Sequence, residues 1–230
     1  MGVRGRLSIT NEDGFFEVRM ESIGGLGANV AGKILAEAGV LQAGLNATNF
    51  ASYGSEKKGS PVKSFVRFSD GDREIRDATP VIKPHVLAVF HEALLRSGDG
   101  VLQGVDRQSV VIVNTRRSPE ELARILEVDA GVVGAVPALD IAVQEKSRVN
   151  MAMLGAVVKA CPFLAPEDVE EVLKTTLGVR YPHLLEANLR AFRRGYEECR
   201  WLDRRPAPDR LAGAEGSDNR APSRANGQAA

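Results

Sequence analysis

The sequence predicts an α/β fold, in which helices flank a doubly wound, mostly parallel sheet. Residues 15–23 alternate apolar and polar side chains as a strand does, a glycine turn follows, and residues 28–43 place apolar side chains at helical spacing. The continuous apolar runs at 86–90 and 110–113 are typical of parallel strands that are covered on both faces. In such a fold, ligands are expected beyond the carboxyl ends of the strands.

The chain is expected to form one domain with a short segment at each end. Its 230 residues, of which 43% are hydrophobic, suffice for one ordinary core. Residues 1–14 are polar and end in a turn-forming cluster, so we expect a flexible N-terminus ahead of a domain at 15–202. Residues 203–230 hold too few apolar side chains to offset their ordering entropy, which predicts a disordered tail.

The remaining elements follow from local patterns in chain order. Ser118 is expected to be a helix N-cap, because Pro119 can take the first helical position and two glutamates follow in the first turn. Further strands are expected at 45–53, 62–68 and 131–136. Helices are expected at 119–127, 139–144, 149–160, 166–176 and 182–201. The C-terminal third is therefore predicted to be mainly helical.

Charge and hydropathy exclude several classes of function. Thirty basic and thirty acidic residues give a net charge of zero, so no overall field attracts nucleic acid or an anionic membrane. The first residues lack an apolar secretory segment, and no run of eighteen apolar residues occurs later. We therefore expect a soluble, cytoplasmic protein that binds neither nucleic acid nor membranes.

The chain carries little chemistry of its own. Its two cysteines, Cys161 and Cys199, form no Cys-x-x-Cys pair, so neither a zinc ribbon nor a cysteine-ligated iron–sulfur cluster is expected. The scattered histidines, His85, His91 and His183, match no zinc or nucleophile motif. No catalytic or metal-binding residue is predicted, and any redox metal would belong to a partner.

The glycine turn after the first strand is the first candidate site. Gly24, Gly25 and Gly27 allow close approach to the backbone, and the following helix directs its unpaired N–H groups at this point, which suits a phosphate. A nicotinamide dinucleotide is disfavoured, because residues 46–53 offer no Asp or Glu to bind its ribose. A structural role, in which the glycines permit tight packing or a subunit contact, is equally compatible with the pattern.

Two further loops follow strands at the same predicted edge. The loop after the second strand combines an aromatic ring, two cations, glycines and hydroxyl groups, which suits a phosphate or carboxylate as well as a solvated turn. Its candidate residues are Tyr53, Gly54, Lys57, Lys58, Gly59 and Ser60. Residues 114–117, Asn-Thr-Arg-Arg, are a candidate for an anion or subunit contact.

Four segments together carry a resemblance to a known family. Residues 23–35, 52–62, 65–70 and 150–156 resemble, in order and spacing, the gamma-type domain of pyruvate and 2-ketoisovalerate ferredoxin oxidoreductases. The resemblance covers roughly residues 15–200. The turn that usually reads Gly-x-Gly-Gly-Gln-Gly in this family is Ser-Ile-Gly-Gly-Leu-Gly here, without the first Gly and the Gln.

The resemblance implies a subunit of a larger enzyme. That enzyme would oxidatively decarboxylate a 2-oxoacid, with pyruvate as the default, and form acyl-CoA, carbon dioxide and reduced ferredoxin. Thiamine diphosphate and iron–sulfur clusters would be held by the partners, which are alpha and beta (thiamine-diphosphate-binding) subunits and a ferredoxin-like subunit. This chain alone would bind no cofactor, and would supply assembly surface and, through Lys57 and Lys58, part of the coenzyme A pocket. A stand-alone nucleotide-binding or regulatory module and a purely structural scaffold remain alternatives.

Overall fold

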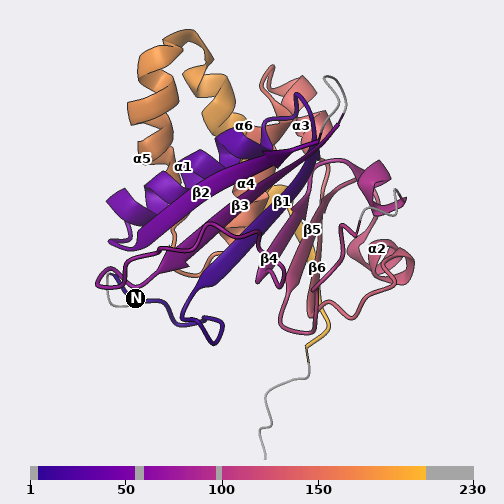
Figure 1. The fold of residues 1–230 in the computed structure, drawn as a ribbon. Coiled ribbons are helices and arrows are strands. Elements are labelled where there is room, and N and C mark those ends of the chain that lie inside the picture. The colour runs from indigo at the N-terminus through magenta and orange to yellow at the C-terminus, as the bar shows by residue number, and fades with distance from the viewer. Residues whose placement is uncertain (1–4, 55–59, 97–99, 206–230) are drawn as a thin grey trace, which may run out of the picture.

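The computed structural model describes residues 5–54, 60–96 and 100–205, and these fold around one seven-stranded sheet (Figure 1). In spatial order the strands are β2-β3-β1-β4-β5-β6-β7. Their bounds are β1 Phe16–Ile23, β2 Asn46–Tyr53, β3 Pro61–Ser69, β4 Val86–Val89, β5 Val110–Asn114, β6 Val132–Val136 and β7 Arg200–Asp203.

The sheet is mostly parallel, as the sequence predicts. Strands β1, β4, β5 and β6 pair in parallel, whereas β3 is antiparallel to both β1 and β2. Strand β7 is antiparallel to β6, so five of the seven described strands share one direction. After β1 the chain forms β2 and then β3 on one side of it, with β2 outermost, and after β4 it builds outward through β5 and β6 on the other side. The carboxyl ends of β1 and β4 therefore form a topological switch point.

The described helices bracket this sheet in the predicted order. Their bounds are α1 Ala28–Leu41, α2 Pro119–Ile125, α3 Ala138–Gln144, α4 Val149–Lys159, α5 Pro166–Leu173 and α6 Leu185–Glu198, with shorter helical turns at Glu92–Arg96, Lys174–Gly178 and Pro182–Leu184. Helix α2 begins with the predicted cap: the Ser118 side chain accepts from the Glu121 N–H, and the Glu121 carboxylate accepts from the Ser118 N–H.

The prediction of a helix through residue 201 is wrong at its end. Helix α6 stops at Glu198, and Arg200–Asp203 forms β7 instead, with Trp201 paired to Gly134 and Leu202 to Val133. The free edge of β6 offers backbone partners that outweigh local helical preference. Of the predicted tail, residues 206–230 lie outside the described residues, and the disorder expected there stays a prediction.

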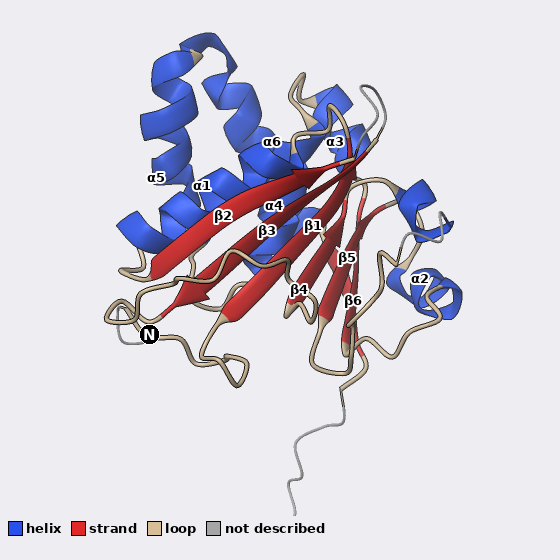
Figure 2. Cartoon of the chain, viewed as in Figure 1, coloured by secondary structure: helices blue, strands red, loops and turns tan. Residues whose placement is uncertain are grey.

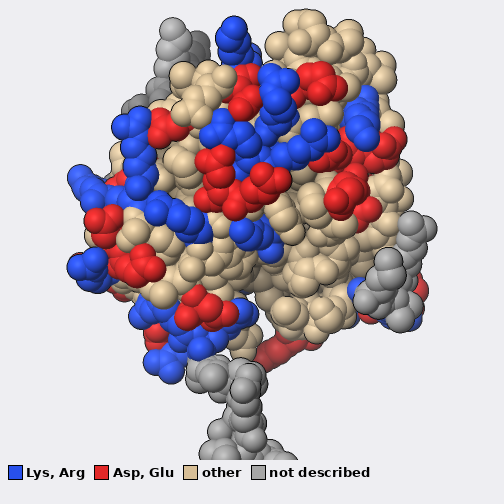
Figure 3. Space-filling model, turned by 180° about the vertical axis from the view of Figure 1, so that it is seen from behind, with Lys and Arg blue, Asp and Glu red and all other residues tan. Residues whose placement is uncertain are grey.

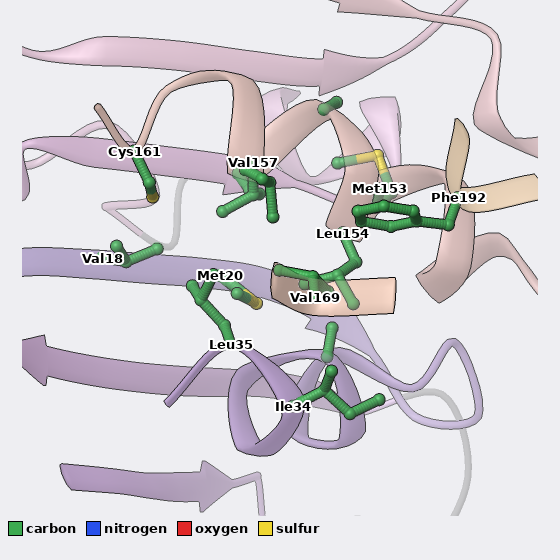
Figure 4. Packing of buried hydrophobic residues seen from close by; sticks show 14 of the residues in the cluster. Val18, Met20, Ile34, Leu35, Met153, Leu154, Val157, Cys161, Val169 and Phe192 are labelled. Atoms are coloured by element: carbon green, nitrogen blue, oxygen red, sulfur yellow. The ribbon is translucent and has the colours of Figure 1, made fainter. Parts of the chain in front are cut away.

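Each face of the sheet is covered by a different set of elements. On one face α1 packs on β1, β2 and β3, and α4 packs on β4, β5 and β6, while α5 and α6 pack against these helices (Figure 2). Figure 4 shows Met20 of β1, Leu35 of α1, Leu154 of α4 and Phe192 of α6 in this cluster. On the other face, α2 and the turn Glu92–Arg96 cover the odd-numbered residues of β4, β5 and β6. Both faces of the central strands are therefore shielded from solvent, which explains their continuous apolar runs.

Helix α4 is the central helix of the larger layer. All of its residues except Lys159 are buried. It crosses α6 where Gly155 and Gly195 face each other's backbone: a Cβ on Gly155 would lie 2.1 Å from the Phe192 carbonyl oxygen, and one on Gly195 would lie 2.0 Å from the Ala152 carbonyl oxygen. Only two glycines permit backbones to approach this closely.

A buried arginine on β1 organises the opposite face. The guanidinium of Arg19 donates to the carbonyl oxygens of Val81 and Ile82 at 3.1 Å, and to those of Val101 and Gln103 at 2.7 and 2.8 Å. These four acceptors belong to the two long connections that precede and follow β4. The Arg19 guanidinium thus attaches both connections to the sheet. It also donates hydrogen bonds to carbonyl groups that would otherwise lack a partner.

The N-terminal segment lies against the domain where it is described. The Gly5 N–H donates to the Ala43 carbonyl at 2.8 Å, and Arg6 pairs with Asp70 and Asp72 at 2.8 and 2.7 Å. These ion pairs are exposed, so their contribution to stability is small. The flexibility expected for residues 1–14 stays a prediction, and residues 1–4 lie outside the described part. Among the described residues, no helix is long and apolar enough to cross a membrane.

We predict that His85 makes the stability of the fold depend on pH. Its Nδ1 accepts a hydrogen bond from the Glu17 N–H at 3.0 Å, and its ring stacks on Phe16. Burial lowers the pKa of His85 below its ordinary value, although the charge of Asp106 opposes this. The unfolded chain therefore binds this proton more readily. The free energy of unfolding should fall as the pH drops through about 6.5, the unfolded value, toward the lower folded value.

The matched variant is His85→Asn, whose amide oxygen can accept the same bond from Glu17 but does not titrate. Urea unfolding at several pH values between about 5 and 8 should then show a shallower acid-side decline for the variant than for the wild type. Identical pH profiles for the two proteins would contradict this role of His85.

Candidate functional site

The glycine turn between β1 and α1 needs its glycines for backbone conformation. Gly25 has φ 97° and Gly27 has φ 82°, both in the left-handed region that side chains disfavour. A Cβ on Gly25 would meet no atom within 4 Å, whereas one on Gly27 would lie 2.6 Å from the Asn150 Nδ2 atom. Gly24 and Gly25 are exposed. Gly27 therefore serves packing, and Gly24 and Gly25 are the accessible part of the turn.

Asn150 joins this turn to α4. Its Nδ2 donates to the Gly27 carbonyl oxygen at 3.3 Å, and its side chain is buried. Its Oδ1 is also buried and accepts no hydrogen bond within the described part of the chain. The N-termini of α1 and α4 are thereby held together, and neither has an acidic residue in its first turn. Sequence reasoning used residues 150–156 only as a family segment, because a contact with residue 27 leaves no local pattern.

The structure brings the described parts of the first two candidate loops together. The Gly24 N–H donates to the Ser60 carbonyl oxygen at 3.0 Å. The Gly54 N–H donates to the Pro61 carbonyl oxygen at 2.9 Å, which closes the base of the loop between β2 and β3. Tyr53, with 63% of its surface exposed, accepts at its hydroxyl from Asn29 of α1. Lys57, Lys58 and Gly59 lie outside the described residues, so their contact with an anion stays a prediction.

The third loop lies beyond the ends of β4, β5 and β6, but its cations are already paired. Arg116 forms two hydrogen bonds with Asp140 at 2.6 and 2.7 Å, and Arg117 pairs with Glu92 at 2.7 Å. Burial opposes ionisation of Glu92, yet hydrogen bonds from Thr115 and Arg117 outweigh it and lower the pKa of Glu92. The two arginines therefore present less free positive charge than the sequence indicates.

Two hollows open at this carboxyl edge. One of about 190 Å³ is lined by His91, Glu92, Asn114, Thr115, Arg116, Pro137, Leu139 and Asp140. The other, of about 220 Å³, is lined by Gly25, Leu26, Leu139, Ala142, Val143, Ser147, Arg148 and Val149. Leu139 separates them. Each is smaller than the roughly 300–1,000 Å³ of ordinary small-molecule sites, so neither encloses a nucleotide-sized ligand.

The described residues offer no reactive centre. No group of three or more His, Cys, Asp or Glu side chains among them could hold a metal ion. Burial raises the pKa of the Cys161 thiol, and burial raises that of Cys199 to about 11. Both cysteines are therefore protonated near neutral pH and are poor nucleophiles or metal ligands. What this edge can provide is exposed backbone, cations and apolar surface for a ligand or partner.

Comparison with known proteins shows which family the chain belongs to. A family model described as pyruvate ferredoxin/flavodoxin oxidoreductase matches residues 17–198, from the second residue of β1 to the end of α6. The chain belongs to this family. The family predicted from the segments at 23–35, 52–62, 65–70 and 150–156 is thus confirmed.

Relatives in this family match the chain over nearly their whole length. Pyruvate synthase subunit PorC of Thermotoga maritima is 35% identical over 189 residues, covering 81% of this chain and 95% of the relative. The pyruvate/ketoisovalerate oxidoreductases common subunit gamma of Pyrococcus furiosus is 37% identical over 184 residues, covering 79% and 96%. The crystal structure of the pyruvate oxidoreductase subunit PORC of T. maritima aligns with a TM-score of 0.70 and 32% identity, covering 82% and 99%.

We predict that Gly27 and Asn150 are energetically coupled. Gly27→Ala should lower the free energy of unfolding by about 2 kcal/mol, because it combines a left-handed backbone with a clash against Asn150. An Asn150→Ala background removes the two closest atoms, Nδ2 and Cγ, and keeps only the Cβ at 3.2 Å, so the same change should cost about 1 kcal/mol less there.

Gly25→Ala is the matched control for the Gly27 variant. This variant has the same backbone strain, but there is open space around its Cβ. It should therefore lower the free energy of unfolding by only about 1 kcal/mol, whether or not Asn150 is replaced by alanine. Chemical denaturation of the single and double variants measures these differences. Equal costs of Gly27→Ala with and without the Asn150 amide would show that the two residues are independent.

Proposed function

We propose that this chain is the gamma subunit of a 2-oxoacid:ferredoxin oxidoreductase that converts a 2-oxoacid, with coenzyme A, to acyl-CoA and carbon dioxide while reducing ferredoxin. The family match across residues 17–198 carries the proposal. It is supported by the printed names of the relatives, which specify pyruvate or pyruvate and ketoisovalerate and describe subunits. Pyruvate is accordingly the proposed substrate, and the cytoplasm is the proposed compartment.

The chain works in this proposal only with partner chains. Thiamine diphosphate would stabilise the carbanion formed on decarboxylation, and iron–sulfur clusters would carry the electrons. The described residues do not fit an iron–sulfur cluster: no group of side chains among them could hold a metal ion, and both thiols are buried and protonated. Alpha and beta subunits and a ferredoxin-like subunit are therefore proposed to hold these cofactors and to pass the electrons to ferredoxin.

For coenzyme A, the described residues fit a partial site. Exposed Gly24 donates to the Ser60 carbonyl, and exposed Tyr53 and Gly54 end the neighbouring β2 side of the same hairpin, whose sequence between Gly54 and Ser60 holds the two lysines. Amide groups and cations of this kind suit phosphate oxygens. The hollows nearby are too small to enclose the whole molecule, so the rest of the pocket would come from a partner.

A stand-alone nucleotide-binding or regulatory module is the weaker alternative. Gly27 packs against Asn150, and the outer strand β2 carries no carboxylate for a ribose. Its sequence, NATNFASY, ends at the exposed Tyr53. Calorimetry of the isolated chain with NAD, FAD and ATP should show no micromolar binding; such binding would favour the alternative.

We predict that activity requires assembly. The chain alone should not turn over pyruvate, and adding it to its cognate partner chains should restore pyruvate- and coenzyme A-dependent reduction of ferredoxin. The reason is that no group of described side chains could hold a metal ion for electron transfer, and thiamine diphosphate is proposed to lie in a partner chain. Full activity of the partner chains without this one would refute the proposed role.

We predict that Lys57→Ala with Lys58→Ala raises the KM for coenzyme A by about tenfold, because each cation is worth about 0.7 kcal/mol to a phosphate contact at a solvated site. The kcat and the assembled size should stay unchanged. The charge-matched control, Lys83→Ala with Lys174→Ala, removes two exposed lysines from before β4 and after α5 and should leave the KM unaltered. A wild-type KM in the Lys57 and Lys58 variant would remove the proposed contact.

A further inference from the structure

The turn between α3 and α4 holds a lysine where the backbone favours glycine. Lys146 has φ 54°, the one positive φ among the described residues other than glycine. The Ser147 N–H donates to the Ala142 carbonyl at 2.9 Å, and the Lys146 N–H donates to the Val143 carbonyl at 3.3 Å. This is the Schellman ending of a helix, in which the left-handed position is usually glycine. Lysine at this position is unfavourable for the fold itself.

Arg148, two residues later, is equally unsuited to its local position. It is the N-cap residue of α4, where Ser, Thr, Asp or Asn would accept a hydrogen bond from the first turn, and its side chain makes no such bond. Its positive charge also lies at the positive end of the helix dipole. Lys146 and Arg148 are thus both unfavourable for local stability. Such residues are expected at positions that have a functional role.

Neither cation is neutralised within the described part of the chain. Lys146 and Arg148 are exposed, and no hydrogen bond or ion pair joins either side chain to another described residue. The arginines of α6 differ, because Arg190 and Arg194 both pair with Glu145. Figure 3 shows that basic and acidic side chains are also interspersed across the back of the molecule. As far as residues 5–54, 60–96 and 100–205 are concerned, the positive charge of this turn is therefore uncompensated.

Exposed apolar side chains lie directly beside these cations. Leu139 and Val143 of α3 are 56% and 70% exposed. With Leu26 of the glycine turn and with Arg148, they line the hollow of about 220 Å³ at the carboxyl edge. Large apolar side chains gathered around a hollow with a charged rim are typical of a protein interface.

We propose that Leu26, Leu139, Val143, Lys146 and Arg148, here called the apolar–basic surface, bind another subunit of the same oxidoreductase. The partner would place an apolar side chain in the hollow and carboxylates opposite the two cations. This proposal rests on the proposed function, which supplies the partner chains. Charge complementarity selects an acidic partner over a second copy of this chain, because an isologous dimer through this surface would bring like charges together.

The decisive variant combines Lys146→Gly with Arg148→Glu. Glycine suits the left-handed backbone, and a glutamate suits the N-terminus of α4, so the denaturation midpoint of the chain should rise. The affinity for the purified cognate partner chains should instead fall by about 100-fold, and its dependence on salt should weaken. Opposite changes in stability and affinity separate an interface role from a folding defect.

An apolar variant and a matched control complete the experiment. Val143→Ser should weaken partner binding by about tenfold without altering the denaturation midpoint appreciably. Ile82→Ser with Lys83→Glu removes an exposed apolar and cationic pair just before β4, at the opposite edge of the parallel strands, and should bind as the wild type does. Titration of fluorescently labelled chain with the partner chains measures all four affinities.

The possible results are distinguishable. Wild-type affinity in the Lys146 and Arg148 variant would overturn the apolar–basic surface and leave the proposed function standing, since the complex would still form. Absence of any complex with the wild-type chain would overturn the proposed function and this inference with it. If ultracentrifugation of the chain alone shows a dimer that Val143→Ser dissociates, a second copy occupies the surface and the proposal is wrong.

Discussion

The close crossing of α4 and α6 is the constraint on which the rest of the structure depends. Gly155 and Gly195 let the two backbones touch, so α4 can lie against β4, β5 and β6 with nearly every residue buried. A helix held so firmly also fixes what lies at its N-terminus. Asn150 locks the glycine turn in place, and the turn ahead of α4 sets the hollow beside Leu139. Helix α4 therefore determines both the packing of the core and the geometry of the candidate site.

Local patterns predicted most of the fold, because most elements are determined locally. The apolar runs that became β4 and β5, and the Ser118 cap of α2, need no knowledge of the rest of the chain. Strand β7 was missed because its pairing depends on the free edge of β6, 65 to 71 residues earlier in the sequence. Tertiary partners decided that segment, and a local reading of Trp201 as helical could not detect them.

The candidate site likewise has features that the sequence could predict and features that it could not. Residues whose role lies in backbone conformation, such as Gly25 and Gly27, could be recognised from the strand, turn and helix pattern. The charge state of the third loop could not, because Asp140, which neutralises Arg116, lies 24 residues away in the sequence. The lysine and arginine between α3 and α4 escaped notice for the opposite reason. They look like an ordinary solvated turn until the backbone angle and the helix start are known.

The position of β7 has a practical consequence for handling the protein. Because β7 runs antiparallel to β6, Asp203 pairs with Val132 at the start of β6, so the described chain leaves the sheet at the amino edge. The glycine turn and the hollows lie at the other edge. An affinity handle or dye attached directly after Arg205, the last described residue, would thus start at the amino edge, whereas an insertion in the hairpin between β2 and β3 would start beside the glycine turn.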